Sequence, residues 1–230
     1  MSIPFQIEVC IENPLDAFPA QAAGATRIEL NSALRLDGLT PTLAACRWLK
    51  AHCSLPLIAM LRPHEGFCLE PLQQEILLDD ARMLLDAGVD GLAYGALDRH
   101  GELHVEYIRQ VAELCGERDL VCHRAFDRLA DQQRGLEQLI DCGVRRVLTS
   151  GGAATAEQGL SRLVELQGWA RGRIEVLPGS GINSGNARRI AQVSGCRQLH
   201  GTYRADPREI AAVCRAIECL HEDKCLPTLL

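Results

Sequence analysis

One short pattern recurs four times along the chain: the end of a helix, a glycine, and then a short apolar strand. The glycines are Gly24, Gly88, Gly143 and Gly195, which lie on average about 57 residues apart. Glycine suits the left-handed position that ends a helix, because it has no Cβ to clash with the backbone. A single strand–helix unit needs about 30 residues. Each interval therefore holds two units, and the chain is predicted to contain about eight strands.

The segments between these repeats carry the remaining strands and the helices. Asn13 and Thr40 are predicted caps of helices that have Pro14 and Pro41 in their first turns. The intervening strands are predicted at Phe5–Cys10, Leu57–Arg62, Asp119–Phe126 and Arg173–Pro178, and the helices at 14–23, 41–52, 72–87, 104–115, 131–142, 156–170, 184–193 and 206–221.

Strict alternation of strands and helices predicts a parallel sheet with right-handed crossovers. Eight near-equal units in about 220 residues fit a (β/α)8 barrel, the TIM-barrel fold, as a single domain over residues 1–230. A doubly wound open sheet is the alternative, but it gives no reason for eight similar units. No linker or low-complexity run indicates a second domain.

Composition excludes several classes of protein. Apolar residues make up 47% and charged residues 23%, as in ordinary globular proteins. A net charge of −6 argues against a nucleic-acid partner. No apolar run is long enough to span a membrane, and the N-terminus does not resemble a signal peptide. We therefore expect a cytoplasmic protein with no membrane partner. Its 11 cysteines, an odd number, are then free thiols rather than a disulfide framework.

Polar residues gather where the predicted strands end, which is where barrel proteins carry their chemistry. Charged residues are unfavourable inside strands unless they are paired. An internal salt-bridge layer would explain them, but a functional pocket explains them better, because a carboxylate and a histidine can divide acid and base roles. Arginines can also clamp an anion. The candidates, whose individual roles the sequence does not assign, are Glu8, Glu29, Arg62, His123, Arg124, Asp127 and His200.

Two glycine-rich turns are candidates for binding an anion or a phosphate. Ser150-Gly151-Gly152 follows the sixth predicted strand, and Gly179-Ser180-Gly181 follows the seventh, where phosphate sites recur in barrels. The alternative is that these glycines only permit tight turns. The second turn does not match the spacing of the dinucleotide fingerprint, so NAD binding is excluded.

Metal ligands are the third candidate chemistry. The chain has no C-x-x-C and no H-E-x-x-H motif, which excludes a zinc finger and a zincin. The carboxylates and histidines at the strand ends could hold a divalent ion, and Cys10 could bind the softer Cu⁺, with a nearby histidine or Met60. Near the C-terminus only Cys214 and His221 share a helix face, whereas Cys219 and Cys225 do not, so we interpret these residues as packing.

The strand-end motifs resemble the CutC family of copper homeostasis proteins. The segments H-R-A-F-D at 123–127 and R-V-L-T-S-G at 146–151 are the most specific matches, and the likeness runs from about residue 5 to about residue 220. Further matching segments are Ile7–Cys10, Gly24–Leu30, Gly38–Pro41, Leu61–Pro63 and Pro178–Ile182.

The resemblance implies a (β/α)8 barrel, a cytoplasmic location, a homodimer or homotetramer, and a role in copper tolerance with copper as the bound ion. In some members the Cu⁺ ligands are two cysteines at the ends of the first two strands. The first matches Cys10, but the second falls on Asn31. An amide is a poor ligand for a soft cation, so this departure weakens the two-thiolate site.

Three functions therefore remain open at the level of the sequence. The first is copper handling through Cys10, which the family resemblance favours. The second is a barrel enzyme that acts on a small anionic or phosphorylated substrate, which the ring of polar residues favours. The third is a scaffold whose barrel mouth is filled by its own loops. We take copper handling as the main hypothesis.

Overall fold

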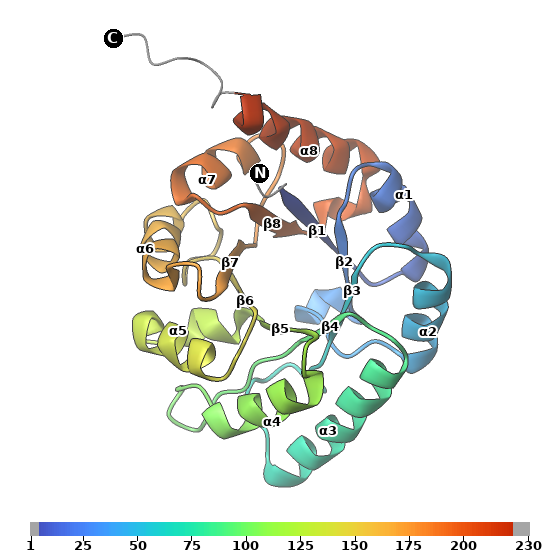
Figure 1. Cartoon of the computed structure of the whole chain (residues 1–230), viewed down its shortest axis with the longest axis vertical. Coiled ribbons are helices and arrows are strands. Elements are labelled where there is room, and N and C mark those ends of the chain that lie inside the picture. The colour runs from blue at the N-terminus through green and yellow to red at the C-terminus, as the bar shows by residue number, and fades with distance from the viewer. Residues whose placement is uncertain (1–4, 223–230) are drawn as a thin grey trace.

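The computed structural model describes residues 5–222, with side chains up to residue 218. Eight strands form the centre of the molecule and eight helices surround them (Figure 1). The strands are β1 (Gln6–Ile11), β2 (Arg27–Leu30), β3 (Leu57–Met60), β4 (Gly91–Ala93), β5 (Asp119–Cys122), β6 (Arg146–Thr149), β7 (Glu175–Pro178) and β8 (Gln198–Gly201). The helices are α1 (Ala17–Ala22), α2 (Leu43–His52), α3 (Pro71–Asp86), α4 (Val105–Cys115), α5 (Gln132–Asp141), α6 (Leu160–Ala170), α7 (Ala187–Ser194) and α8 (Pro207–Glu222).

The strands are parallel and follow one another around the barrel in the order β7-β6-β5-β4-β3-β2-β1-β8. β1 pairs with β8, so the sheet has curled round and brought the first and last strands together. Within the described residues no hydrogen-bonded ladder joins β7 to β8, although the two strands lie side by side and nearly close the ring (Figure 1). The (β/α)8 barrel predicted from the repeat is confirmed, and the open doubly wound sheet is excluded.

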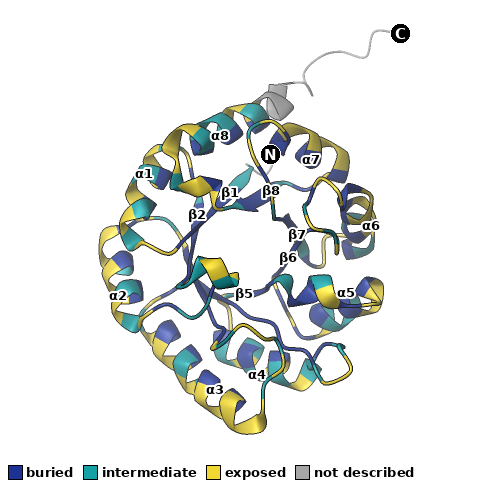
Figure 2. Ribbon diagram, turned by 180° about the vertical axis from the view of Figure 1, so that it is seen from behind, coloured by how far each residue is buried: buried dark blue, intermediate teal, exposed yellow. Residues whose placement is uncertain are grey.

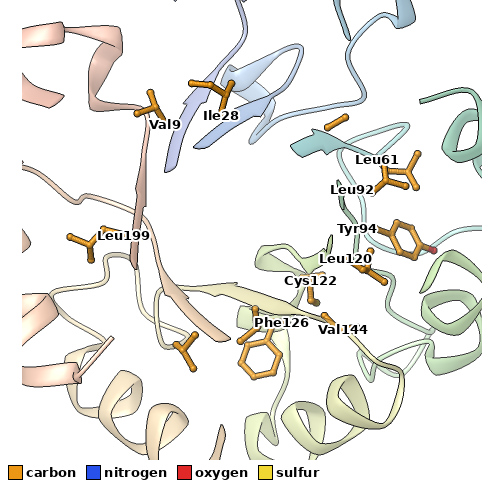
Figure 3. Close-up of a cluster of buried hydrophobic side chains, with 14 of the residues drawn as sticks. Val9, Ile28, Leu61, Leu92, Tyr94, Leu120, Cys122, Phe126, Val144 and Leu199 are labelled. Atoms are coloured by element: carbon orange, nitrogen blue, oxygen red, sulfur yellow. The ribbon is translucent and has the colours of Figure 1, made fainter. Parts of the chain in front are cut away.

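Side chains alternate along every strand, because successive residues of a strand point to opposite faces. The outward set, which includes Val9, Ile28 and Leu199, packs against the helices (Figure 3). Burying such side chains contributes about 1.5–3 kcal/mol each, so the layer between strands and helices is the main core. The strands are buried and the outer faces of the helices are exposed (Figure 2).

The barrel interior is divided into two chemically different halves. An apolar half comes from β3 to β7, and its buried side chains are Ile58, Met60, Ala93, Val121, Leu148 and Leu177. β1, β2 and β8 instead place Glu8, Cys10, Glu29 and His200 on the inward face, all of them buried. At this level of the interior the polar side chains therefore lie on one side of the barrel, whereas Arg146 of β6 is buried at the level below.

The four repeat glycines occupy the predicted conformation. Gly24, Gly88, Gly143 and Gly195 have φ of +103°, +88°, +74° and +74°, in the region that favours glycine. Asn13 caps the helical turn that begins at Pro14, as predicted, by accepting from the backbone N–H of Leu15.

Several predicted boundaries were wrong: α6 begins at Leu160 rather than 156, α7 at Ala187 rather than 184, and β7 at Glu175 rather than Arg173. β5 ends at Cys122 rather than Phe126, because the His123 ring accepts a hydrogen bond from the Ala125 N–H and starts a 3-10 helix. β3 ends at Met60 rather than Arg62. The cap of α2 is Thr42, not Thr40, since the Thr40 hydroxyl accepts from the Arg62 N–H.

No helix within residues 5–222 is long and apolar enough to cross a membrane. Cys225 lies outside the described residues, and the side chains of Cys219 and His221 lie outside the described part, so the structure does not test the interpretation of that cluster.

Two glycines of the same segment provide a test of the packing around β6. A Cβ at Gly159 would lie 1.9 Å from the carbonyl oxygen of Ser150, whereas a Cβ at Gly168 would meet nothing within 4 Å. We expect Gly159→Ala to lower the free energy of unfolding by roughly 1–3 kcal/mol or more. Gly168→Ala, on the exposed face of α6, should raise it by roughly 0.5–1 kcal/mol.

Urea unfolding followed by circular dichroism measures both changes. Equal effects of the two substitutions would contradict the close approach of Gly159 to the turn at Ser150.

Candidate functional site

A cavity of about 830 Å³ opens at the carboxyl ends of the strands. Most of the residues predicted from the strand ends lie around it. The cavity is lined by Cys10, Glu29, Arg62, His123, Arg124, Asp127, Ser180, Gly181 and His200, whereas Glu8, Ser150, Gly151 and Gly179 do not line it.

The register of the strands explains which side chains meet on the polar side of this cavity. Cys10 of β1 is the register partner of Glu29 of β2, and Glu8 lies between Arg27 of β2 and His200 of β8. Ligand atoms of Cys10, Glu29 and His200 all lie within 4.8 Å of one another. A thiol, a carboxylate and an imidazole are thus brought together by strand pairing alone.

Glu8 lies below this cluster and fixes the orientation of His200. One carboxylate oxygen accepts from Nε of Arg27, and the other is 2.7 Å from Nδ1 of His200. Burial opposes the charge on Glu8, but Arg27 and the bond to His200 outweigh it and hold the pKa of Glu8 well below its usual range. Because Nδ1 of His200 is taken, Nε2 is the nitrogen left for a ligand.

Asn31 holds the other two members of the cluster. Its side-chain amide donates to Sγ of Cys10 at 3.1 Å and to Oε1 of Glu29 at 3.0 Å. The second carboxylate oxygen of Glu29 is buried and has no hydrogen-bond partner. Burial, followed by the charge of Glu29, raises the pKa of Cys10, and burial also raises the pKa of Glu29.

These residues fit a metal ion. Thiolate and imidazole are ligands for copper and zinc, and three protein donors with an open position are typical of a metal that exchanges ligands. Burial keeps the Cys10 thiol protonated, and a bound cation would counter this effect by favouring the thiolate. The cation would also bind the oxygen of Glu29 that has no hydrogen-bond partner. Glu8 and Asn31 supply the outer hydrogen bonds that orient such ligands. Among the nine described cysteines, Cys10 alone lines the cavity.

Asp127 is placed at the rim but is already fully engaged. Its carboxylate accepts from the side chains of Thr149 and Arg124 and from the backbone N–H groups of Ser150 and Gly152. The N–H of Gly151 donates to the hydroxyl of Thr149. The turn predicted to bind an anion therefore has its donors partnered within the protein, and Asp127 lies where the anion was expected.

The turn after β7 is built differently. Ser180 and Gly181 line the cavity with φ of +78° and +72°, and the Ser180 hydroxyl donates to the Ala154 carbonyl. The N–H of Gly179 donates to Thr149, and a Cβ at this position would lie 2.5 Å from Cδ1 of Leu148 and 3.3 Å from the His200 ring. Gly179 therefore leaves room for Leu148 and His200.

Sequence reasoning missed the polar layer beneath the site. Gln198 accepts from both Arg27 and Arg146, and Arg146 also pairs with Asp119 and Glu175. The sequence does carry a signal for this layer. Arg27 lies two residues before Glu29, and Gln198 two residues before His200, so each pair shares the inward face of its strand. Phe67 and Tyr203, which also line the cavity, carry no such signal because Phe67 lies in a loop and Tyr203 in a short 3-10 helix, outside the strands.

The fold and this site define a (β/α)8-barrel protein with a buried thiol, carboxylate and imidazole at the carboxyl end of its strands. Comparison with known proteins identifies the family. The CutC family model matches residues 5–205, and the chain belongs to the CutC family.

Three relatives illustrate this membership. The chain is 40% identical to a family protein CutC of Treponema denticola over 196 residues, covering 85% of this chain and 80% of the relative. It is 37% identical to the copper homeostasis protein cutC homolog of Mus musculus over 202 residues, covering 87% and 74%. The crystal structure of CutC from Streptococcus agalactiae superposes with a TM-score of 0.82 at 28% identity, covering 86% of this chain and 98% of the other.

The ion pair at Glu8 provides a test of the buried network. Removing its carboxylate with Glu8→Ala would leave Arg27 buried without its partner and would free the His200 ring. We expect the free energy of unfolding to fall by roughly 3–5 kcal/mol, the usual cost of breaking a buried pair. Chemical denaturation measures the change.

The matched control is Glu137→Ala, because Glu137 pairs with Arg173 in an exposed position. Exposed pairs contribute little to stability. If the two variants lost similar stability, Glu8 would not have the anchoring role that the geometry assigns to it.

Proposed function

We propose that this protein binds a copper ion at the cluster formed by Cys10, Glu29 and His200, as part of a role in copper homeostasis. The observation that carries the proposal is the approach of a thiol, a carboxylate and an imidazole to within 4.8 Å at the inner wall of an open cavity. Strand pairing fixes these donors, so the site is formed before the ion arrives.

Cu⁺ is the preferred ion for two reasons. Thiolate and thioether donors select Cu⁺, and Met60 lines the same cavity as Cys10. The names of the mouse and human relatives, both called copper homeostasis protein cutC homolog, support the same choice. Zn²⁺ suits the same donor types, so it is the ion against which preference must be measured.

We also propose that the protein is cytoplasmic and forms a homodimer or homotetramer, as the family resemblance implies. The nine described cysteines are all free, which is compatible with a reducing compartment.

An anaerobic Cu⁺ titration against a chromophoric chelator tests the proposal. Cys10→Ser removes the soft donor and should weaken Cu⁺ binding at the tightest site by roughly 10–100-fold or more, because even outer-sphere changes cost that much. Glu8→Gln, which removes the charge behind His200, should weaken it by a similar factor.

Cys68→Ser is the matched control, since Cys68 is exposed and lies outside the cavity. It should leave the tightest affinity unchanged. Equal affinities of the wild type and the Cys10 variant would exclude the site, and tighter binding of Zn²⁺ than of Cu⁺ in competition would reject the choice of metal.

Asn31 offers a gain-of-function test. Its amide already lies 3.1 Å from the sulfur of Cys10. Asn31→Cys would place a second thiol beside the first, and we expect Cu⁺ affinity to rise by at least roughly tenfold because soft ligands select this ion. The same competition titration measures it, and Asn31→Ser, which adds a hard oxygen instead, should show no gain. An unchanged affinity in Asn31→Cys would contradict the position of the ion beside Cys10.

A further inference from the structure

The metal cluster occupies only one wall of the cavity. A volume of about 830 Å³ is in the range of pockets that hold small organic molecules, and it is far larger than a single ion needs. Another part of the wall carries Arg62, which follows β3, and His123, which follows β5, and neither takes part in the cluster of Cys10, Glu29 and His200.

His123 presents a neutral imidazole with a single available donor. Its Nδ1 accepts a hydrogen bond from the backbone N–H of Ala125, at 3.2 Å. A backbone N–H can only donate, so Nδ1 carries no proton and the proton of the neutral ring lies on Nε2. Burial, followed by the charge of Arg62, lowers the pKa of His123 to about 3, so the ring is neutral at pH 7.

The Nε2–H of His123 is itself unused. His123 is only 3% exposed, and Nε2 is buried with no hydrogen-bond partner in the described part of the chain. A buried donor without a partner is unfavourable by roughly 1–3 kcal/mol. A ligand oxygen that accepts from Nε2 would remove this penalty.

Arg62 adds a buried positive charge. Its guanidinium donates to the backbone carbonyl oxygens of Leu36, Gly38, Glu65 and Gly66. These four bonds use four of its five N–H groups and leave one on Nη2. All four partners are neutral, and within residues 5–218 no carboxylate forms a direct ion pair with Arg62, while the charges of Asp37 and Glu65 act on it from farther away. The charge is held in place without a direct ion pair.

Phe67 joins the two groups into one site. Its ring centroid lies 4.7 Å from the Arg62 guanidinium carbon and 5.3 Å from the centroid of the His123 ring. Phe67 therefore covers both donors on one side and shields them from water, which strengthens their attraction for an anion.

We propose that this wall of the cavity binds the oxyanion of a small organic acid or phosphate ester, held by the charge of Arg62 and by the Nε2–H of His123. The remaining volume, between this wall and Glu29, accommodates the rest of such a molecule. Arg124, which also lines the cavity, is paired with Asp127 and is not part of this site. The site uses none of the proposed metal donors, so it does not rest on copper binding.

The test uses the full-length protein, freed of metal by passage over a chelating resin, because soluble chelators are themselves anions. Malonate and inorganic phosphate are the probes, and neutral acetamide is the control ligand. Affinity is measured by isothermal titration, and ¹⁵N-histidine labelling follows the ring nitrogens. We expect at least one anion to bind and to shift the Nε2–H signal of His123, while acetamide binds at least tenfold more weakly.

Two histidine substitutions make the test specific. His123→Asn keeps an oxygen near the position of Nδ1, and so preserves the bond to Ala125, but it removes the Nε2 donor. We expect it to weaken anion binding by at least tenfold without unfolding the protein. His104→Asn is the matched control, because Nδ1 of His104 likewise caps a helix, α4, but lies away from the cavity. It should leave the affinity unchanged.

The outcomes separate clearly. Binding of malonate alone or of phosphate alone supports the site and identifies its oxyanion. The proposal is overturned if neither anion binds, if acetamide binds as tightly as the anions, or if His123→Asn binds as tightly as the wild type. If that variant does not fold, the wild-type Nε2–H signal decides, since no shift on saturation with either anion would also overturn it. The Cu⁺ titration is a separate measurement on the same protein, so either function can fail alone.

Discussion

A single buried carboxylate organises the polar half of this barrel. Glu8 is fully buried on β1, and its charge is stable there because Arg27 pairs with it from the neighbouring strand. Its other oxygen fixes the ring of His200 on the opposite neighbour, β8. Without Arg27 the buried charge would be prohibitively costly, and without Glu8 the imidazole would have no fixed orientation. The proposed metal site therefore depends on a salt bridge that does not itself line the cavity.

The contrast between the two halves of the interior explains how one barrel can be both stable and functional. From β3 to β7 the inward side chains at the level of the site are apolar and pack against one another, and Arg146 of β6 is buried below them. The polar residues of the site are on β8, β1 and β2, where Glu8 pairs with Arg27 on the neighbouring strand, and Arg146 pairs with Asp119 and Glu175 on its two neighbouring strands. An even distribution of the same residues around the ring would leave charges too far apart to pair.

Much of this arrangement could be predicted from the sequence, and the reasons are physical. The glycine repeat predicted the number of strands because ending a helix in the left-handed region favours glycine. The inward face of each strand followed from the two-residue period, which correctly put Glu8 with Cys10 and Glu29 with Asn31. Register is a long-range property, so the sequence alone could not show that Cys10 pairs with Glu29 or that Glu8 meets His200. The hydrogen bonds that the turn at Ser150 donates to Asp127 are also tertiary contacts, as are those from Arg62 to four backbone carbonyls. The sequence alone could not show either set.

The seam between β7 and β8 sets this barrel apart from a fully closed one. In the part of the chain that the structure describes, every other neighbouring pair of strands is held by a ladder of backbone hydrogen bonds, whereas these two are in contact without one. His200 stands on one side of the seam, and the turn of Ser180 and Gly181 follows the strand on the other. Separating these two strands breaks no backbone ladder, so the contact between β7 and β8 depends on side-chain packing and on the helices that cover it. The histidine that the buried carboxylate holds in place therefore stands beside the seam of the ring that has no hydrogen-bonded ladder.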